Sequence, residues 1–406
     1  MYILGLETSC DETAAAVLSV DDTGVVKVLA NIVASQIVLH ASYGGVVPSL
    51  AAREHIKNLN PVLEAALKKA DQPKLDLIAV TSGPGLISSL LVGTTFAQTY
   101  AWRKKLPILG VNHIEGHIYS NWLTPLTETN SSQLPIISTS ELIDLPQFEA
   151  RLSTVRQLAE RCTGQYTGVR NGSRNKEMGQ IRELRFPAVC LIVSGGHTEL
   201  ILMQGHGDYQ LIGRTRDDAA GEAFDKIARI LELGYPGGPA IAERAKVFET
   251  SGKNKLGIKL PRPMLNISTF DFSFSGLKTA VLYLVRDLLT DHKLEEIRDE
   301  IAHETQEAIV ETLVNKTMRA AQKYEAASVI LAGGVSANQR LREYLCKHAQ
   351  GENIPLILPD PVYTTDNAAM IAMAGYQKFK NQKSKIKIEE EYHWSKIKAD
   401  ANWELV

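Results

Sequence analysis

Apolar residues at the start of the chain fall into two short runs, Tyr2 to Leu6 and Thr13 to Leu18, separated by a polar turn. These runs predict a β-hairpin whose tip carries carboxylates and hydroxyls, a suitable edge for a cleft. From Leu50 to Ala70 the spacing becomes that of a helix. Its apolar stripe consists of Leu50, Ile56, Leu59, Leu63 and Leu67. A strand from Leu75 to Val80 with glycines after it completes the pattern of an α/β sheet.

The same order of patterns returns in the second half of the chain. Ala188 to Val193 forms an apolar run, a glycine turn follows, and Glu199 to Met203 forms a second run. Near the end, Ser328 to Ala332 leads into a glycine loop and a helix. We therefore predict an α/β protein with two lobes, each opening with a hairpin. This arrangement resembles the two-lobed actin/Hsp70/sugar-kinase (ASKHA) fold, in which a nucleotide lies between the lobes.

The pattern breaks between Thr124 and Arg185. The first part of this segment is polar and lacks periodicity, and its last part is rich in Arg and Lys. A loop of this length is unusual in a compact domain, so we interpret it as an insertion, partly disordered or containing one helix from Leu145 to Cys162. The expected domains are an N-terminal lobe (1–123), the insertion (124–185), a C-terminal lobe (186–362), and a helix and tail returning toward the N-terminal lobe (363–406).

Composition limits the classes of function. A chain of 406 residues fits two domains, and a hydrophobic content of 44% supplies a large core. The net charge of −2 gives no global basic field, so any contact with nucleic acid would use a local patch or a partner protein. The four cysteines form no CxxC pair and indicate reduced thiols. With no presequence and no membrane segment, we expect a cytoplasmic protein.

Two histidines, His113 and His117, are spaced i, i+4, which places both imidazoles on one helix face with Cβ atoms about 5 to 6 Å apart. This is metal-ligand spacing, although two surface or core histidines are the alternative. Asp366 lies in a polar turn before a helix of small residues, and is a candidate third ligand or else a helix N-cap. Such a set would leave open positions on a metal for water or substrate.

Glycine loops form the second group of candidate residues. The runs Val193 to His197, Tyr235 to Pro239 and Ala332 to Asn338 would let backbone amides approach a phosphate or nucleotide, although plain turns are the alternative. In a predicted helix, Asp218, Glu222 and Asp225 share one face. They could bind ribose hydroxyls or form a solvated acidic face.

Taken together, these segments resemble the Kae/TsaD/Qri family of tRNA threonylcarbamoyladenosine transferases. Ten runs agree in the family's order and cover nearly the whole chain except Thr124 to Arg185. The opening Leu4 to Thr13 and the run Tyr43 to Pro48 are similar to the bacterial and organellar branch. The other matching runs are Gly83–Gly85, His113–His117, Val193–Thr198, Asp217–Lys226, Tyr235–Pro239, Phe272–Thr279, Gly333–Asn338 and Thr365–Met370.

The resemblance implies that His113, His117 and Asp366 bind one divalent metal, Fe²⁺ or, as the alternative, Zn²⁺. It also implies a donor, threonylcarbamoyl-AMP, made by a separate synthase and transferred to N6 of the adenosine beside the anticodon. The residues implied to bind the donor are Ile192, Val193, Ser194, Gly195, Gly196, Asp225, Gly238 and Asn338. Asp11, at the hairpin tip, is our candidate for the group that accepts the proton of the attacking amine.

The family further implies the partners tRNA, a paralogous TsaB-type subunit and a TsaE-type ATPase. Two rival functions are a sugar or acetate kinase of the same fold, which leaves the histidine pair unexplained, and an inactive scaffold, which does not explain the full set of site residues. Because no family run lies within Thr124 to Arg185, we expect this segment to be dispensable for acyl transfer.

Overall fold

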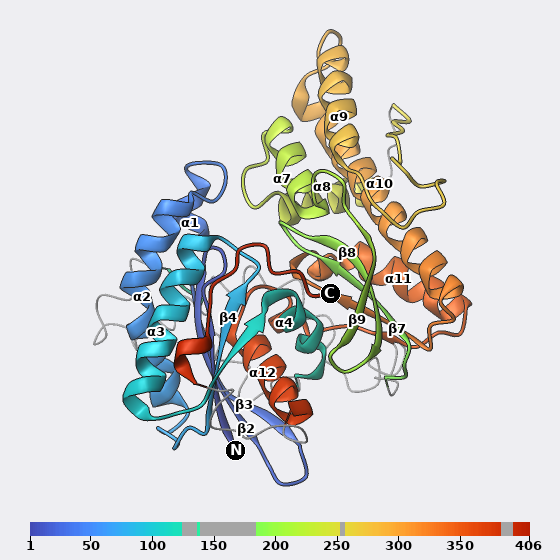
Figure 1. Ribbon diagram of the computed structural model, residues 1–406. Helices are drawn as coiled ribbons and strands as arrows, with labels where there is room; N and C mark the ends of the chain where they lie inside the picture. Colours follow the sequence, from blue (N-terminus) through green and yellow to red (C-terminus); the bar gives the residue numbers. More distant parts are fainter. Residues whose placement is uncertain (124–135, 139–183, 252–255, 383–392) are drawn as a thin grey trace. The chain divides into compact units, whose positions relative to one another are not determined.

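The computed structural model describes residues 1–123, 136–138, 184–251, 256–382 and 393–406. The chain divides into two compact units (Figure 1). Unit 1 comprises Met1–Gln180 and Asp366–Leu405, and unit 2 comprises Ile181–Thr365 with Val406. The predicted helix Leu145 to Cys162 lies outside the described residues.

Unit 1 is built on a six-stranded sheet with the order β5-β4-β1-β2-β3-β6. The hairpin predicted at the N-terminus is confirmed, since β1 and β2 pair antiparallel on either side of the polar tip. The strands are β1 (Tyr2–Glu7), β2 (Glu12–Val20), β3 (Val26–Ser35), β4 (Leu77–Gly83), β5 (Ile108–Asn112) and β6 (Ile136–Ser138). The helices are α1 (Ile37–Ala41), α2 (Pro48–Lys69), α3 (Ile87–Lys104), α4 (His113–Tyr119), η1 (Ser120–Trp122), α12 (Ala368–Gln382) and η6 (Trp394–Lys396).

The alternation along β1 explains how helices cover both faces of this sheet. Leu4 and Leu6 belong to an apolar cluster with residues of α2 and α3. Gly5 lies between them and points to the other face. There a Cβ on Gly5 would lie 2.1 Å from the carbonyl oxygen of Ala368, in the first turn of α12. Only a residue without a side chain lets α12 pack this closely on β1.

The helix predicted from Leu50 to Ala70 is confirmed as α2, but its predicted apolar stripe is partly wrong. Leu59 and Leu63 are buried, whereas Ile56 is 67% exposed. In the first half of α2 the buried side chains are those of Ala51 and the polar residues Glu54, His55 and Asn58. His55 explains the difference, because its ring bonds Thr13 Oγ1 (2.8 Å) and the carbonyl of Cys10 (3.0 Å) at the hairpin tip.

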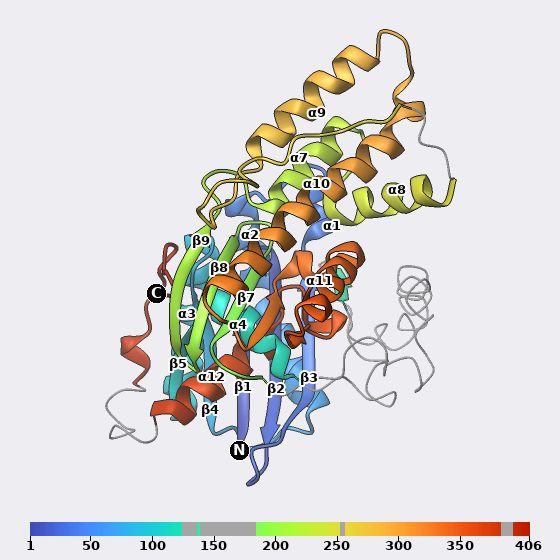
Figure 2. The same cartoon turned by 90° about the vertical axis from the view of Figure 1, so that its right-hand side faces the viewer.

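Unit 2 contains a five-stranded sheet with the order β11-β10-β7-β8-β9. Alternate residues of β7, among them Val189 and Leu191, pack into an apolar cluster with α7 and α10. Helices α8 and α10 also pack against each other (Figure 2). The strands are β7 (Ala188–Val193), β8 (Thr198–Gly205), β9 (Asp208–Arg214), β10 (Ser328–Ala332) and β11 (Leu356–Ile357). The helices are α7 (Ala220–Ile230), α8 (Gly237–Ser251), α9 (Ser275–Leu288), α10 (Leu294–Lys323), η4 (Gly334–Ala337), α11 (Gln339–Gly351) and η5 (Pro361–Tyr363).

Two further findings concern the predicted insertion and the character of the helices. Residues 136–138 of the predicted insertion form strand β6, which pairs parallel with β3 at one edge of the sheet in unit 1. Among the helices of the described residues, none has the length and apolar character that a membrane span requires.

Candidate functional site

Both histidines of the predicted metal site lie on α4, which begins directly after β5. Asn112 ends the strand and caps the helix, because its side-chain oxygen accepts hydrogen bonds from the backbone amides of Ile114 (2.9 Å) and Glu115 (3.3 Å). Its side-chain nitrogen donates to the carbonyl of Trp403 (3.0 Å). One amide side chain therefore fixes the start of the histidine helix and joins it to the end of the chain.

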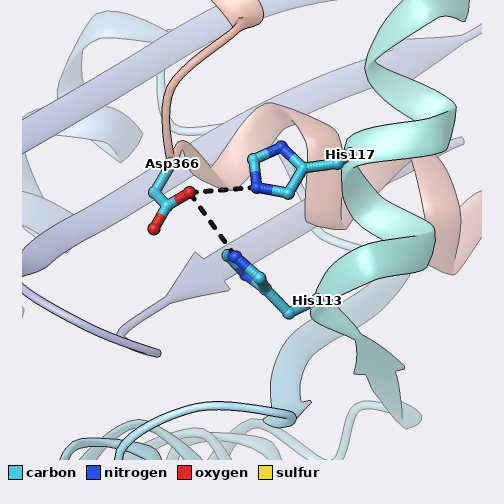
Figure 3. Close-up of side chains that lie close together, drawn as sticks. All are labelled: His113, His117 and Asp366. Atoms are coloured by element: carbon cyan, nitrogen blue, oxygen red, sulfur yellow. Dashed lines mark ion pairs between the residues drawn. The ribbon is translucent and has the colours of Figure 1, made fainter. Parts of the chain in front are cut away.

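Asp366 meets the two histidines from the segment just before α12 (Figure 3). Its Oδ1 lies 3.1 Å from His117 Nε2 and 3.5 Å from His113 Nε2. The alternative role of helix cap is filled by the neighbouring residue, since the Asn367 side chain accepts a hydrogen bond from the amide of Met370 (3.1 Å). The three candidate ligands thus come together within unit 1, although Asp366 is far along the chain.

The donor set fits a divalent metal. One atom from each residue lies within 4.8 Å of the other two, and the set of two imidazoles and a carboxylate suits iron or zinc. His117 is fully buried, and neither of its ring nitrogens has a hydrogen-bond partner among the described residues. Its Nε2 is close to Asp366 but is not aligned for a hydrogen bond with it. A metal ion between these atoms would satisfy that nitrogen.

His113 has a different environment from His117. Its Nδ1 lies 3.0 Å from Glu7 Oε2 and 3.2 Å from Ser9 Oγ, at the end of β1. Burial favours the neutral ring, but the carboxylates of Asp366 and Glu7 outweigh burial and raise the pKa of His113 to about 9. Without a metal, the ring therefore carries a positive charge at neutral pH.

The hairpin tip beside this site holds a pair of carboxyl groups. Asp11, the candidate proton acceptor, is buried, and its side chain hydrogen-bonds Glu12. Burial and the charges of Asp11 and Asp366 raise the pKa of Glu12 well above its usual range. Two close carboxylates disfavour double ionisation, which favours the protonated form of Glu12.

A second group of metal-ligand types occurs in unit 2 and has a different character. Glu249, His303 and Glu307 could also bring one atom each within 4.8 Å of one another. However, both carboxylate oxygens of Glu307 accept hydrogen bonds from Arg340, each at 2.7 Å. This bidentate ion pair already satisfies the carboxylate with a cation, so the group does not match the histidine site of unit 1.

The glycines predicted to approach a ligand divide into two kinds in unit 2. A Cβ on Gly195, Gly196 or Gly238 would meet no atom within 4 Å, so these three border open space. At Gly333 a Cβ would lie 2.4 Å from the carbonyl oxygen of Val193, and its φ of +89° is one that favours glycine. Gly333 therefore packs the loop before η4 against the end of β7.

The polar residues predicted to bind the donor hold these loops in place. Asp225 Oδ1 accepts a hydrogen bond from the amide of Gly237 (2.6 Å) at the start of α8. Asn338 caps α11 by accepting from the amide of Leu341 (2.9 Å), and it donates to the Gln306 side chain (3.0 Å). The other two carboxylates of the predicted acidic face, Asp218 and Glu222, form ion pairs with Lys226.

The sequence model of one family, described as TsaD, tRNA N6-adenosine threonylcarbamoyltransferase, matches residues 27–139 and 152–373 of this chain. The chain belongs to this family. It is 46% identical to the tRNA N6-adenosine threonylcarbamoyltransferase of Thermomicrobium roseum, covering 93% of this chain and 91% of that protein. A relative of the same name from Bacillus thuringiensis is 41% identical over 92% of this chain and 90% of its own length. The predicted family is thereby confirmed, and with it an enzyme of the transferase class.

Solved structures confirm the predicted fold class. HypF of T. kodakarensis is similar with a TM-score of 0.51 and 13% identity, covering 97% of this chain and 48% of that one. A full-length HypF in a phosphate- and nucleotide-bound form gives a TM-score of 0.50 with 10% identity, covering 94% and 46%. The protein has the α/β fold of the ASKHA class. Within the predicted insertion the family model leaves unmatched only 140–151, a narrower stretch than the runs of residues indicated.

Sequence reasoning missed the polar groups behind the predicted ligands. Glu7 stood in the predicted turn, yet it ends β1 and is fully buried against His113. His55 lies in α2, which was predicted from its apolar stripe, so the polar residues of this helix were not considered. The signal that could have found both is a charged or imidazole side chain at a position where the strand or helix period demands burial.

Proposed function

We propose that this enzyme transfers the threonylcarbamoyl group of threonylcarbamoyl-AMP to N6 of the adenosine beside the anticodon, in tRNAs that read codons starting with adenine. The observation that carries the proposal is the meeting of His113, His117 and Asp366 in a chain of this family. A sugar or acetate kinase has no use for these three residues. We place the reaction in the cytoplasm.

The three residues would hold one divalent metal, with Fe²⁺ favoured and Zn²⁺ as the alternative. When bound, the metal would polarise the carbamoyl group by coordinating an oxygen of the donor. Burial of both histidines supports this role, because a site shielded from water strengthens every charge interaction within it.

In unit 2 we propose that the adenylate is bound by Ile192 to Gly196, Asp225, Gly238 and Asn338. Support comes from the open space beside Gly195, Gly196 and Gly238, where backbone amides can approach a phosphate. Amides at these loops would stabilise negative charge on AMP as it leaves. The bonds of Asp225 and Asn338 to the starts of α8 and α11 hold the loops in one arrangement.

The reaction forms a bond between N6 and the carbamoyl carbon, breaks the bond from that carbon to the phosphate oxygen, and releases one proton. We propose Asp11 as the group that accepts this proton. Its buried side chain lies at the hairpin tip and hydrogen-bonds Glu12. A carboxylate held in this way is a suitable group for a general base.

We also propose that the enzyme works with a TsaB-type subunit and a TsaE-type ATPase. Exposed apolar side chains on neighbouring helices of unit 1 support a protein partner: Val38 on α1, Ile56 on α2 and Leu91 on α3. The starts of α2 and α3 lie side by side, since Ser88 Oγ donates to the carbonyl of Pro48 (3.4 Å). Exposed apolar side chains such as these are groups that a protein interface can cover.

The proposed function is tested by incubating the enzyme and both partner proteins with tRNA, the synthase, threonine, bicarbonate and ATP. Mass spectrometry of the digested tRNA should show adenosine carrying a threonylcarbamoyl group. The matched control replaces His113 and His117 together by Ala, which should abolish the modified nucleoside. Unmodified tRNA with the intact, metal-loaded enzyme would contradict the proposal, and phosphorylation of a small metabolite instead would favour the kinase alternative.

A further inference from the structure

The two histidines of the candidate metal centre differ on the side of the ring that faces away from Asp366. His113 Nδ1 lies 3.0 Å from a carboxylate oxygen of Glu7. His117 Nδ1 is buried and has no hydrogen-bond partner among the described residues. The two rings would therefore not be equivalent as ligands.

Glu7 is a fully buried carboxylate that is fixed from three directions. Its Oε2 accepts a hydrogen bond from Thr81 Oγ1 (2.6 Å) on β4, and its Oε1 accepts one from the backbone amide of Ser9. The third contact is His113 on α4. A buried negative charge is tolerated when it is hydrogen-bonded and paired, and His113 is the ionisable partner that it faces.

We infer that Glu7 is a positioning residue for the metal centre: it holds the Nδ1 proton of His113, so that the Nε2 lone pair is presented to the metal. This inference rests on the proposed metal site. The physical reason is that neutral imidazole carries one proton, and a carboxylate that accepts it at Nδ1 leaves Nε2 as the only coordinating atom. The carboxylate also makes Nε2 more basic and restricts rotation of the ring.

Ser9 offers an alternative partner, because its Oγ lies 3.2 Å from the same Nδ1. The carboxylate is favoured for two reasons: its contact is shorter, and a hydrogen bond to a charged acceptor is stronger than one to a hydroxyl. The two residues thus form a natural pair for comparison, since both touch Nδ1 and only one carries a charge.

The first test measures Zn²⁺ affinity of the full-length chain by competition with a chromophoric chelator. Glu7→Gln preserves size and hydrogen-bonding ability but removes the charge, and should weaken Zn²⁺ binding by ~10- to 100-fold. Ser9→Ala should change the affinity much less. If Glu7→Gln binds Zn²⁺ as the unaltered protein does while His113→Ala loses it, the inference is wrong and the metal site stands. If His113→Ala also keeps its affinity, the site itself is wrong.

The second test needs no variant and guards against a Glu7→Gln protein that does not fold. Histidine labelled with ¹⁵N in the Zn²⁺-loaded protein gives the protonation of each ring nitrogen by NMR. His113 should carry its proton on Nδ1, with Nε2 bound to the metal. A signal showing Nδ1 bound to Zn²⁺, or Nδ1 without a proton, would overturn the inference whatever the affinities are.

Discussion

Charge on the His113 ring makes metal binding dependent on pH. Burial alone would lower the pKa of this residue, but Asp366 and Glu7 raise it to about 9. Since a coordinating imidazole must be free of its Nε2 proton, a metal has to displace that proton at any lower pH. Affinity should therefore rise by about tenfold per pH unit below pH 9 and become constant above it. Zn²⁺ titrations across this range check the slope, and a flat profile would contradict it.

Asp225 has two tasks that substitutions can separate. It caps α8 through Gly237 in addition to its proposed contact with the donor. Asp225→Ala should cost about 1 kcal/mol of stability through the lost cap and also weaken binding of a non-hydrolysable adenylate analogue. Asp225→Asn keeps an acceptor oxygen for the cap but loses the charge. This variant should therefore keep its stability, while its affinity for the analogue should be reduced. Calorimetry and denaturant unfolding measure the two effects. Full affinity in the Asn variant would argue against a donor contact through the charge.

Residue types and spacing picked out candidate ligands and left ordinary histidines and a helix cap as alternatives, and the resemblance to the family then implied the ligand set. The surroundings of these residues could not be predicted. The i, i+4 histidines and the turn at Asp366 could be picked out because metal ligands belong to few residue types. The supporting role of Glu7 depends on β1, β4 and α4 meeting at one point. No local sequence pattern shows that these three elements contact one another, so the role of Glu7 can be recognised only from the fold.

At the scale of elements, the packing of α12 on β1 should control the metal site. Gly5→Ala would place a methyl group 2.1 Å from the carbonyl oxygen of Ala368, and a backbone atom of a helix cannot move aside cheaply. We expect a loss of about 1 to 3 kcal/mol or more in the free energy of unfolding. Metal content should fall as well, because Asp366 leads into the displaced helix.

Denaturant unfolding and elemental analysis measure the two consequences of Gly5→Ala. Gly205→Ala is the matched control, since a Cβ there meets no atom within 4 Å. Its stability should be unchanged or slightly raised. A Gly5→Ala protein with normal stability and full metal content would show that α12 can shift without carrying Asp366 away.

Elements with a strong period were predicted well from the sequence. The hairpin, α2 and the strands that precede glycine loops occur where the pattern placed them. Errors arose where burial serves polar contacts, as in the first half of α2, whose inward face holds Glu54 and His55. Hydrophobic periodicity assigns the buried face of a helix from its apolar residues alone. It therefore predicted that Ile56 is buried, whereas this side chain is exposed.

At the scale of the whole molecule, the stretch that separates this chain from its family can be tested by deletion. The family model leaves out residues 140–151, between two matched segments. We expect a chain with a short Gly/Ser linker in their place to fold, bind metal and modify tRNA at the normal rate, because closure entropy varies only slowly with loop length. A folded variant with normal metal content and tRNA affinity but no transfer would place this stretch in the chemistry.

The return of the chain to unit 1 is the feature of the whole molecule that local patterns describe least. Asp366 and α12 belong to the first unit although the whole of the second unit separates them from β5 and α4. The sequence analysis predicted a helix and tail (363–406) that return toward the N-terminal lobe. Periodicity alone gives two sets of strands and helices without saying which set the last helix joins.

The hydrogen bonds of the Asn112 side-chain amide also affect the local dynamics of α4. Segments with little regular structure open more often than the elements that they cover, and Trp403 lies in a segment whose described residues form only the short helix η6. Each opening would break the hydrogen bond from the Asn112 side chain to the carbonyl of Trp403, while the same side chain still accepts from the first amides of α4. Hydrogen exchange at Ile114 and Glu115 should therefore quicken when the last residues are removed, and a bound metal should slow it again. The exchange rate of two backbone amides would then report, from a distance, whether the end of the chain is in place.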